Sequence, residues 1–169
     1  MAKAVLISIR PEWAEKILAG EKTLEVRKNR PNMEPPFKCY IYCTNNGVAM
    51  GMWGKHGKVV GEFVCDKITR LTHIGFSGFP GNRLVAMKDG YTIDGSFPIY
   101  KSLLTMQQIE KYLDGKDGYV WHISNLKIYD DPKQLSEFKG LRKTKFGYEP
   151  VEIKRPPQSW CYVEGLRNE

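Results

Sequence analysis

The chain has 169 residues, of which 41% are hydrophobic and 12% aromatic, so its composition excludes an intrinsically disordered or low-complexity protein. Its 26 Lys and Arg residues exceed its 19 Asp and Glu residues, which gives a formal net charge of +7 at pH 7 and favours polyanionic partners. A basic protein without such a partner would show the same surplus, so charge alone does not decide between the two. The length suits a single domain over residues 1–169.

The cysteines are predicted to be reduced and mostly buried, because they form no Cys-x-x-Cys pair and no cluster with histidine at zinc spacing. They are Cys39, Cys43, Cys65 and Cys161. The sequence also lacks a Walker loop and a dinucleotide fingerprint, so we expect neither a metal nor a cofactor. No apolar run approaches the ~18 residues of a membrane span, and charged residues interrupt the N-terminal segment early. We therefore expect a cytoplasmic protein without a membrane partner.

The first half of the chain is predicted to form strands around one short helix. A β-branched apolar run at residues 4–9 favours the first strand. Pro11 suits the first turn of a helix, which apolar residues at helical spacing extend to Ala19, with Gly20 as the stop. A proline-rich loop is expected over 29–36 and a glycine-rich turn over 45–57. Further strands are expected at residues 23–28, 38–44 and 58–71.

The second half is predicted to contain an irregular insertion and another helix. Glycine and proline cluster across residues 73–101, which we interpret as an insertion that shields one end of the sheet. Thr105 and Gln108 have the spacing of a capping box, and the helix should end near Leu113. Strands are expected at 119–129 and 159–163. Many strands with two or three helices indicate an α+β fold, a small mixed β-barrel with short helices packed at its ends.

The densest polar segment lies between the first helix and the second strand. In a strand over residues 23–28, alternation places Glu25 and Arg27 on one face. Lys22, in the preceding turn, would lean over the same face. Such a group can clamp an anion while Glu25 accepts hydrogen bonds from a base edge. A solvated ladder of alternating charges on an edge strand is the alternative interpretation.

This segment, Gly-x-Lys-x-x-Glu-x-Arg after a strand and a Pro-initiated helix, resembles the ASCH domain, a branch of the PUA-like superfamily. Residues 119–123 and 155–163 are similar to the ends of uncharacterised ASCH proteins of phages and bacteria, and only about 73–101 falls outside the resemblance. The resemblance implies a β-barrel whose cleft, lined by Lys22, Glu25 and Arg27, binds RNA or nucleotides. Some small relatives are amidohydrolases that deacetylate acetylated cytidine with a motif lysine and a threonine nucleophile. Glu25 stands where that threonine falls, so their covalent mechanism does not carry over.

Two further features are candidates for contacts with nucleic acid. Trp53 lies in the glycine-rich turn and is the best candidate to stack on a base, whereas the other aromatic candidates are expected to be mostly core. Those others are Tyr40, Tyr42, Trp121 and Trp160. A run without an acidic residue is a candidate for phosphate contacts, with a solvated loop as the alternative. It holds Lys139, Arg142, Lys143 and Lys145.

Three hypotheses about function follow. The first is a binding module for RNA, a modified base or a nucleotide in the polar cleft. The second is a hydrolase of a nucleoside amide or RNA in the same cleft, with Lys22 handling a proton and Glu25 acting as general acid or base. The third is a protein-interaction domain whose basic face binds an acidic partner and whose cleft binds no nucleotide.

Overall fold

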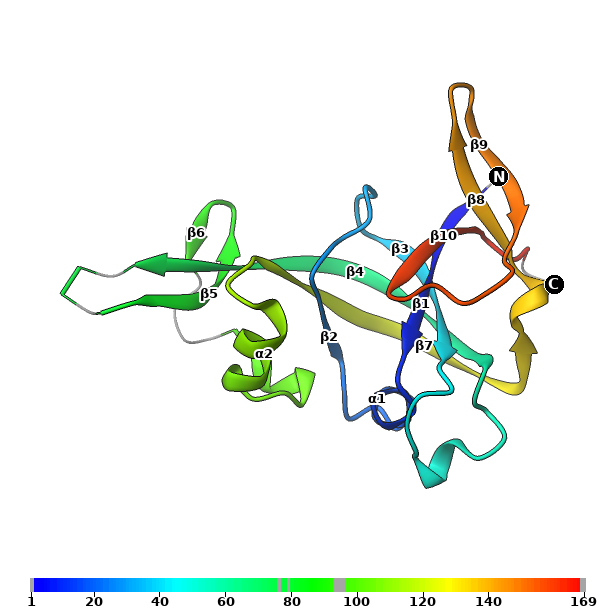
Figure 1. Ribbon diagram of the computed structural model, residues 1–169, viewed down its shortest axis with the longest axis horizontal. Coiled ribbons are helices and arrows are strands. Elements are labelled where there is room, and N and C mark those ends of the chain that lie inside the picture. The colour runs from blue at the N-terminus through cyan, green and yellow to red at the C-terminus, as the bar shows by residue number, and fades with distance from the viewer. Residues whose placement is uncertain (1, 76, 79, 93–96, 168–169) are drawn as a thin grey trace.

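A ten-stranded mixed sheet dominates the computed structural model, which describes residues 2–75, 77–78, 80–92 and 97–167 (Figure 1). The strands are β1 (Lys3–Ile9), β2 (Leu24–Arg27), β3 (Phe37–Cys43), β4 (Lys58–Gly75), β5 (Asn82–Lys88), β6 (Tyr91–Thr92), β7 (Gly118–Gln134), β8 (Lys139–Thr144), β9 (Gly147–Glu152) and β10 (Trp160–Glu164). The helices are α1 (Pro11–Leu18) and α2 (Met106–Leu113), with 3₁₀ turns η1 (Met50–Met52), η2 (Ile99–Ser102) and η3 (Leu135–Glu137). None of the described helices is long and apolar enough to span a membrane.

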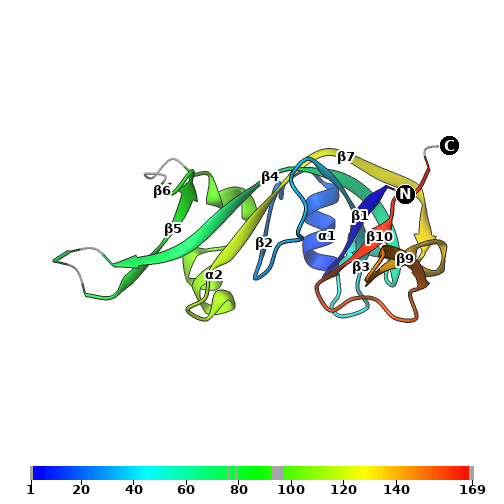
Figure 2. The ribbon, with the colours of Figure 1, turned by 90° about the horizontal axis from the view of Figure 1, so that it is seen from above.

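The strand order is β2-β7-β4-β3-β1-β10-β8-β9, with β5 paired to β4 and β6 paired to β5. Strands β1 and β3 run parallel, with Ile9 opposite Cys43, and the other described pairings are antiparallel. Helix α1 lies between β2 and β1, beneath the arch made by β4 and β7 (Figure 2). The sheet is therefore curved as expected for a barrel, but backbone pairing among the described residues leaves its ends, β2 and β9, unjoined.

Three apolar clusters hold these layers together. The first packs α1 against one face of β1, β3 and β7, and the fully buried Trp121 belongs to it. The second lies on the other face and includes Tyr40 and Phe138, whose rings meet edge to face at 5.0 Å. The third joins α2 to β2, β5 and β7 through the fully buried Ile109 and Leu113. The third cluster matters most for the site because it positions α2 beside β2.

The expected irregular insertion over residues 73–101 is wrong for most of the described residues. Strand β4 continues to Gly75, and β5 pairs with it from Asn82 to Met87. Within β5, Leu84 and Ala86 alternate with more exposed neighbours and pack into the third cluster. A two-residue turn with positive φ at Asp89 and Gly90 then connects β5 to β6. Asp-Gly between two strands is typical of a hairpin, but the many other glycines and prolines of this stretch favoured an irregular segment instead. Residues 93–96 lie outside the described residues.

The basic run predicted over residues 139–145 forms strand β8 rather than a loop. It pairs with β9 in a hairpin that projects from the sheet at the side opposite β5 (Figure 1). Thr144 lies opposite Gly147, so Lys145 and Phe146 form the tip.

Several local predictions are confirmed. Thr105 accepts a hydrogen bond from the backbone N–H of Gln108, whose side chain accepts one from the backbone of Thr105, so α2 begins with the expected capping box. All four cysteines are free thiols and three of them are buried. Helix α1 begins at Pro11 and ends at Leu18, one residue before the predicted end.

Candidate functional site

Strand β2 presents the motif side chains because its two faces have different surroundings. Leu24 and Val26 pack into the third apolar cluster, against α2 and β7. Alternation then turns Glu25 and Arg27 to the other side of the strand, as predicted. Gly20, with a φ of 75°, allows the chain to reverse after α1, and the backbone N–H of Lys22 donates to Lys16 at 3.1 Å. This turn brings Lys22 back over the polar face of β2.

Glu25 is the centre of a buried ionic group with Lys22 and Arg27. Its Oε1 accepts from Nε of Arg27 at 2.9 Å, and its Oε2 lies 3.4 Å from Nζ of Lys22. Lys22 is 1% exposed, and Glu25 and Arg27 are each 8% exposed. The group is thus the buried trio that the strand pattern predicts, and it is not a solvated ladder of charges.

Arg27 also ties β2 to two segments that are distant in sequence. Its Nη2 donates to the backbone carbonyl of Ser8 in β1 at 2.7 Å, and its Nη1 donates to Oγ of Ser159 at 3.3 Å. Ser8 in turn donates its hydroxyl to the carbonyl of Pro157 at 2.6 Å. The guanidinium therefore connects β2 to β1 and to the segment before β10, with which β2 makes no described backbone pairing.

Lys22 is held from the opposite end of the site. Its Nζ donates to the carbonyl of Ser102, the last residue of η2, at 2.5 Å, and lies 5.2 Å from the centre of the Trp13 ring. Burial lowers the pKa of Lys22, while the charge and hydrogen bond of Glu25 act in the opposite direction. A lysine of this kind gives up a proton more readily than an exposed one.

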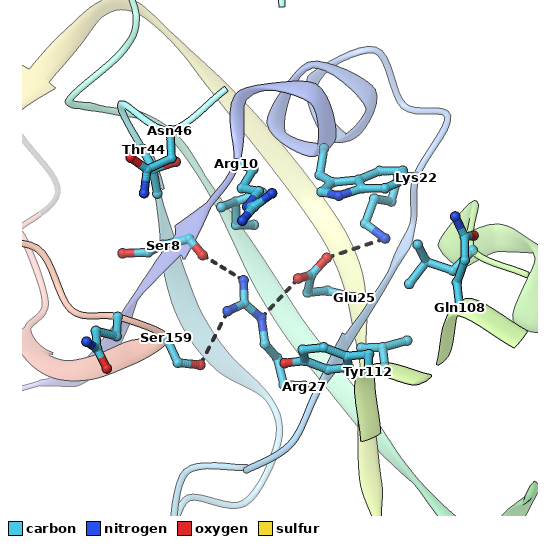
Figure 3. A pocket seen from close by; sticks show the side chains of 15 residues that line it. Ser8, Arg10, Lys22, Glu25, Arg27, Thr44, Asn46, Gln108, Tyr112 and Ser159 are labelled. Carbon is cyan, nitrogen blue, oxygen red and sulfur yellow. Dashed lines mark hydrogen bonds and ion pairs between the residues drawn. The ribbon is translucent and has the colours of Figure 1, made fainter. Parts of the chain in front are cut away.

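The trio forms the floor of a cleft of about 500 Å³ (Figure 3). Around it the cleft is lined by Ser8, Ile9, Arg10, Trp13, Val26, Thr44, Asn46, Leu104, Gln108, Tyr112, Gln158 and Ser159. In Figure 3, Thr44 and Asn46 lie at one end of the cleft, Lys22 and Gln108 lie at the other, and Arg10 lies between them. Apart from the trio, sequence reasoning found none of these side chains in a ligand role. They come from five separate segments, and no local spacing connects them.

The other predicted contacts lie outside the cleft lining. Trp53 follows η1 and is 92% exposed, so it could reach a ligand only beyond the cleft. Tyr40, Tyr42 and Trp121 are core residues, as expected, and Trp160 is half-buried against Trp121. The predicted phosphate contacts all lie on or at the tip of the β8–β9 hairpin, where Arg142 pairs with Glu149 and Lys145 lies over the Phe146 ring. These are Lys139, Arg142, Lys143 and Lys145.

The described residues include no group of three or more His, Cys, Asp or Glu side chains that could share a metal ion. Thr69 and His122 do form a pair, with Oγ1 and Nε2 2.9 Å apart. Burial lowers the pKa of His122, so this pair is a neutral hydrogen bond at pH 7. It is not part of the cleft lining.

Comparisons with known proteins match the motif segment to a family model and the overall fold to solved structures. The family model of the ASCH domain matches residues 7–79, the segment that contains Lys22, Glu25 and Arg27. Among solved structures, the chain is similar to an ASCH protein from Zymomonas mobilis, with a TM-score of 0.53, 18% identity, and coverage of 95% of this chain and 87% of that chain. A serine-to-alanine variant of that protein gives a TM-score of 0.56 at 18% identity, over 95% and 88% of the two chains. A tyrosine-to-phenylalanine variant gives 0.51 at 17% identity, over 95% and 90%. No curated protein sequence matches significantly.

Proposed function

We propose that this chain, whose residues 7–79 match the ASCH-domain family model, binds an RNA, a nucleotide or a modified nucleoside in the cleft above Lys22, Glu25 and Arg27. The observation that carries this proposal is the buried ionic trio on the floor of a cleft large enough for a small ligand. The ASCH domain is a PUA-like family often linked to RNA binding, which supports the same class of ligand.

The trio offers complementary groups to the edge of a base. Each oxygen of Glu25 takes part in one described ion pair, and a carboxylate oxygen can accept more than one hydrogen bond. An amino or ring N–H of a base can therefore donate to Glu25 without displacing Lys22 or Arg27. Gln108 uses its carbonyl oxygen in the capping box, which leaves its amide NH₂ to donate into the cleft.

Two aromatic side chains of the lining can hold the flat face of a base. Trp13 comes from α1 and is half-buried, and Tyr112 comes from α2 and is 40% exposed. Base–aromatic stacking contributes about 1–3 kcal/mol per base, and it does not depend on base identity. Stacking on Trp13 or Tyr112 would thus supply affinity, while Glu25 and Gln108 would supply selectivity.

Hydrolysis in the same cleft is the second candidate function. It is favoured by the lowered pKa of the buried Lys22 beside a carboxylate, because such a lysine gives up a proton more readily than an exposed one. In this version Glu25 would position a water as general acid or base. Turnover that disappears in Glu25→Gln while a ligand still binds would select it over simple binding.

The β8–β9 hairpin would serve a longer ligand. Three of its cations, Lys139, Lys143 and Lys145, have no described ion pair, and they lie on an element that projects into solvent. We propose that they contact phosphates of an RNA strand that extends beyond the cleft.

The test is a titration of the protein with a panel of nucleosides, nucleotides and short RNAs, followed by a crystal structure with the tightest ligand. Glu25→Gln should weaken binding about tenfold, as expected for losing a charged acceptor. Glu62→Gln is the matched control, since Glu62 is a carboxylate paired with Lys38 at 3.0 Å in a different groove. If no member of the panel binds, or the ligand lies away from the trio, the proposal fails and the protein-interaction hypothesis takes its place.

A further inference from the structure

One end of the cleft lies where the parallel strands β1 and β3 finish. Ile9 and Cys43 are the last paired residues, and the chain continues into Arg10 on one side and Thr44 on the other. The backbone N–H of Thr44 donates to the carbonyl of Ile9 at 2.9 Å, which keeps the two exits together. In Figure 3, Thr44 and Asn46 lie at this end of the cleft, and Arg10 lies between them and the trio. The carboxyl ends of parallel strands are a common location for ligands, since the chain opens there between strand and helix.

The polar groups at this end have no described partner within the protein. Arg10 is the N-cap of α1 through its backbone only, and its exposed guanidinium makes no described hydrogen bond or ion pair. The hydroxyl of Thr44 is shielded from solvent and has no hydrogen-bond partner among the described residues, although Thr44 lines the cleft. A shielded hydroxyl without a partner costs free energy, and a change of the Thr44 rotamer that turns it into the cleft would let a ligand atom recover that cost.

The lining of the cleft also carries more positive than negative charge. Its lining holds three cations, Arg10, Lys22 and Arg27, and one carboxylate, Glu25. Glu25 already serves Lys22 and Arg27, so the charge of Arg10 has no counterpart in the lining.

The nearest acidic residue along the chain does not supply that counterpart. Glu12, in the first turn of α1, is turned toward Gly47, where an added Cβ would lie 2.7 Å from its Oε2, and it does not line the cleft. No ion pair between Glu12 and Arg10 is described, so the Arg10 guanidinium remains available to an anionic group in the cleft.

We infer that Arg10, Thr44 and Asn46 form a phosphate subsite, so that the cleft takes a phosphorylated nucleotide unit in preference to a free nucleoside. This inference rests on the proposed function, and it concerns the phosphate group of the ligand, which the trio would not contact. Arg10 would hold two phosphate oxygens with its planar fork, and the Thr44 hydroxyl and Asn46 amide would donate to the others. The base would lie over Glu25, between the subsite and α2.

The phosphate could belong to a free nucleotide or to the backbone of RNA. Isothermal titration with a nucleoside, its 5′- and 3′-monophosphates and the corresponding dinucleoside monophosphate distinguishes them. We expect a phosphate to improve affinity about tenfold or more, the effect of one charged, bidentate interaction. A gain with a monophosphate assigns the subsite to free nucleotides, and a gain restricted to the dinucleoside assigns it to an RNA strand.

Arg10→Gln should abolish this gain, so that the variant binds the nucleoside and its phosphates with equal affinity. Arg167→Gln is the matched control, because Arg167 is an exposed arginine in the groove of Lys38 and Tyr129. Thr44→Val removes the unpartnered hydroxyl at constant shape, so it should reduce the phosphate gain without lowering the melting temperature.

The outcomes separate the inference from the function it rests on. If neither nucleosides nor nucleotides bind, the proposed function fails and the subsite with it. If nucleosides bind as tightly as their phosphates, the cleft proposal holds and the subsite is overturned. A phosphate gain that persists in Arg10→Gln or disappears equally in Arg167→Gln overturns the assignment to Arg10.

Discussion

Replacing Glu25 by glutamine tests the ionic trio directly, because the change keeps the size of the side chain, removes its negative charge and replaces one accepting oxygen by an NH₂ group. Two cations then remain in the protein interior without a counter-ion. Lys22, at 1% exposure, cannot reach water, and Arg27 is held in place by Ser8 and Ser159. We expect the variant to fold, with a lower free energy of unfolding.

The size of the effect follows from the two distances. At an effective dielectric constant of about 20, a 3.4 Å pair and a 2.9 Å pair each contribute about 5–6 kcal/mol of attraction before desolvation is subtracted. Desolvation offsets much of this, and removal of one partner of a buried pair typically costs about 3–5 kcal/mol. Glutamine can still accept a hydrogen bond from Arg27, so we expect a loss near 3 kcal/mol at pH 7.

The loss should shrink as the pH rises. Burial lowers the pKa of Lys22 below 10.5, and Glu25 limits that shift, so the folded variant should have a still lower lysine pKa. In each protein, stability rises with pH between the folded and unfolded pKa values of Lys22, because the unfolded chain binds the proton that the folded chain has lost. This window opens at a lower pH in the variant. The difference in the free energy of unfolding between the natural protein and Glu25→Gln is therefore largest at low pH. It decreases as the pH rises from the folded Lys22 pKa of the variant to that of the natural protein.

Urea denaturation at pH 7 and pH 9.5 measures this difference. The control is the same substitution in a Lys22→Met background, where the cost of Glu25→Gln should be smaller and should vary less with pH. A cost below about 0.5 kcal/mol at pH 7, typical of exposed substitutions, would refute the conclusion that these charges interact in the interior.

Two other substitutions follow from the same site and from the hairpin. Arg27→Lys keeps the charge but cannot donate to Glu25, Ser8 and Ser159 together. We therefore expect ligand affinity, measured by titration, to fall about tenfold. Unchanged affinity would show that the fork geometry of the arginine is dispensable. For RNA, the logarithm of affinity should fall linearly with the logarithm of salt concentration, by about 0.7 per phosphate contact, and changing the four β8–β9 hairpin cations (Lys139, Arg142, Lys143 and Lys145) to glutamine should flatten that slope. Neutralising Lys88 and Lys116 should leave the slope as it is, and an unaffected slope in the hairpin variant would restrict RNA binding to the cleft.

Local sequence patterns predicted the side chains that form the floor of the cleft. Period-two alternation assigned Glu25 and Arg27 to one face, because apolar Leu24 and Val26 had to face the other way toward packing partners. Thr105 and Gln108 identified the start of α2, since a capping box satisfies backbone N–H groups within one turn. The stretch over 73–101 was misjudged because glycine and proline weaken the pattern, whereas pairing with the long strand β4 stabilises β5 whatever its local propensity.

By itself, then, the sequence determined the motif strand, the helix ends and the reduced cysteines, all of which depend on neighbours within a few residues. Only the tertiary structure decided what surrounds the motif. Lys22 meets the carbonyl of Ser102, and Arg27 meets Ser159, across 80 and 132 residues of chain. The parallel pairing of β1 with β3 places Arg10 beside Thr44. These neighbours follow from the curvature of the sheet and the packing of α2, which are long-range, cooperative features that no local spacing encodes.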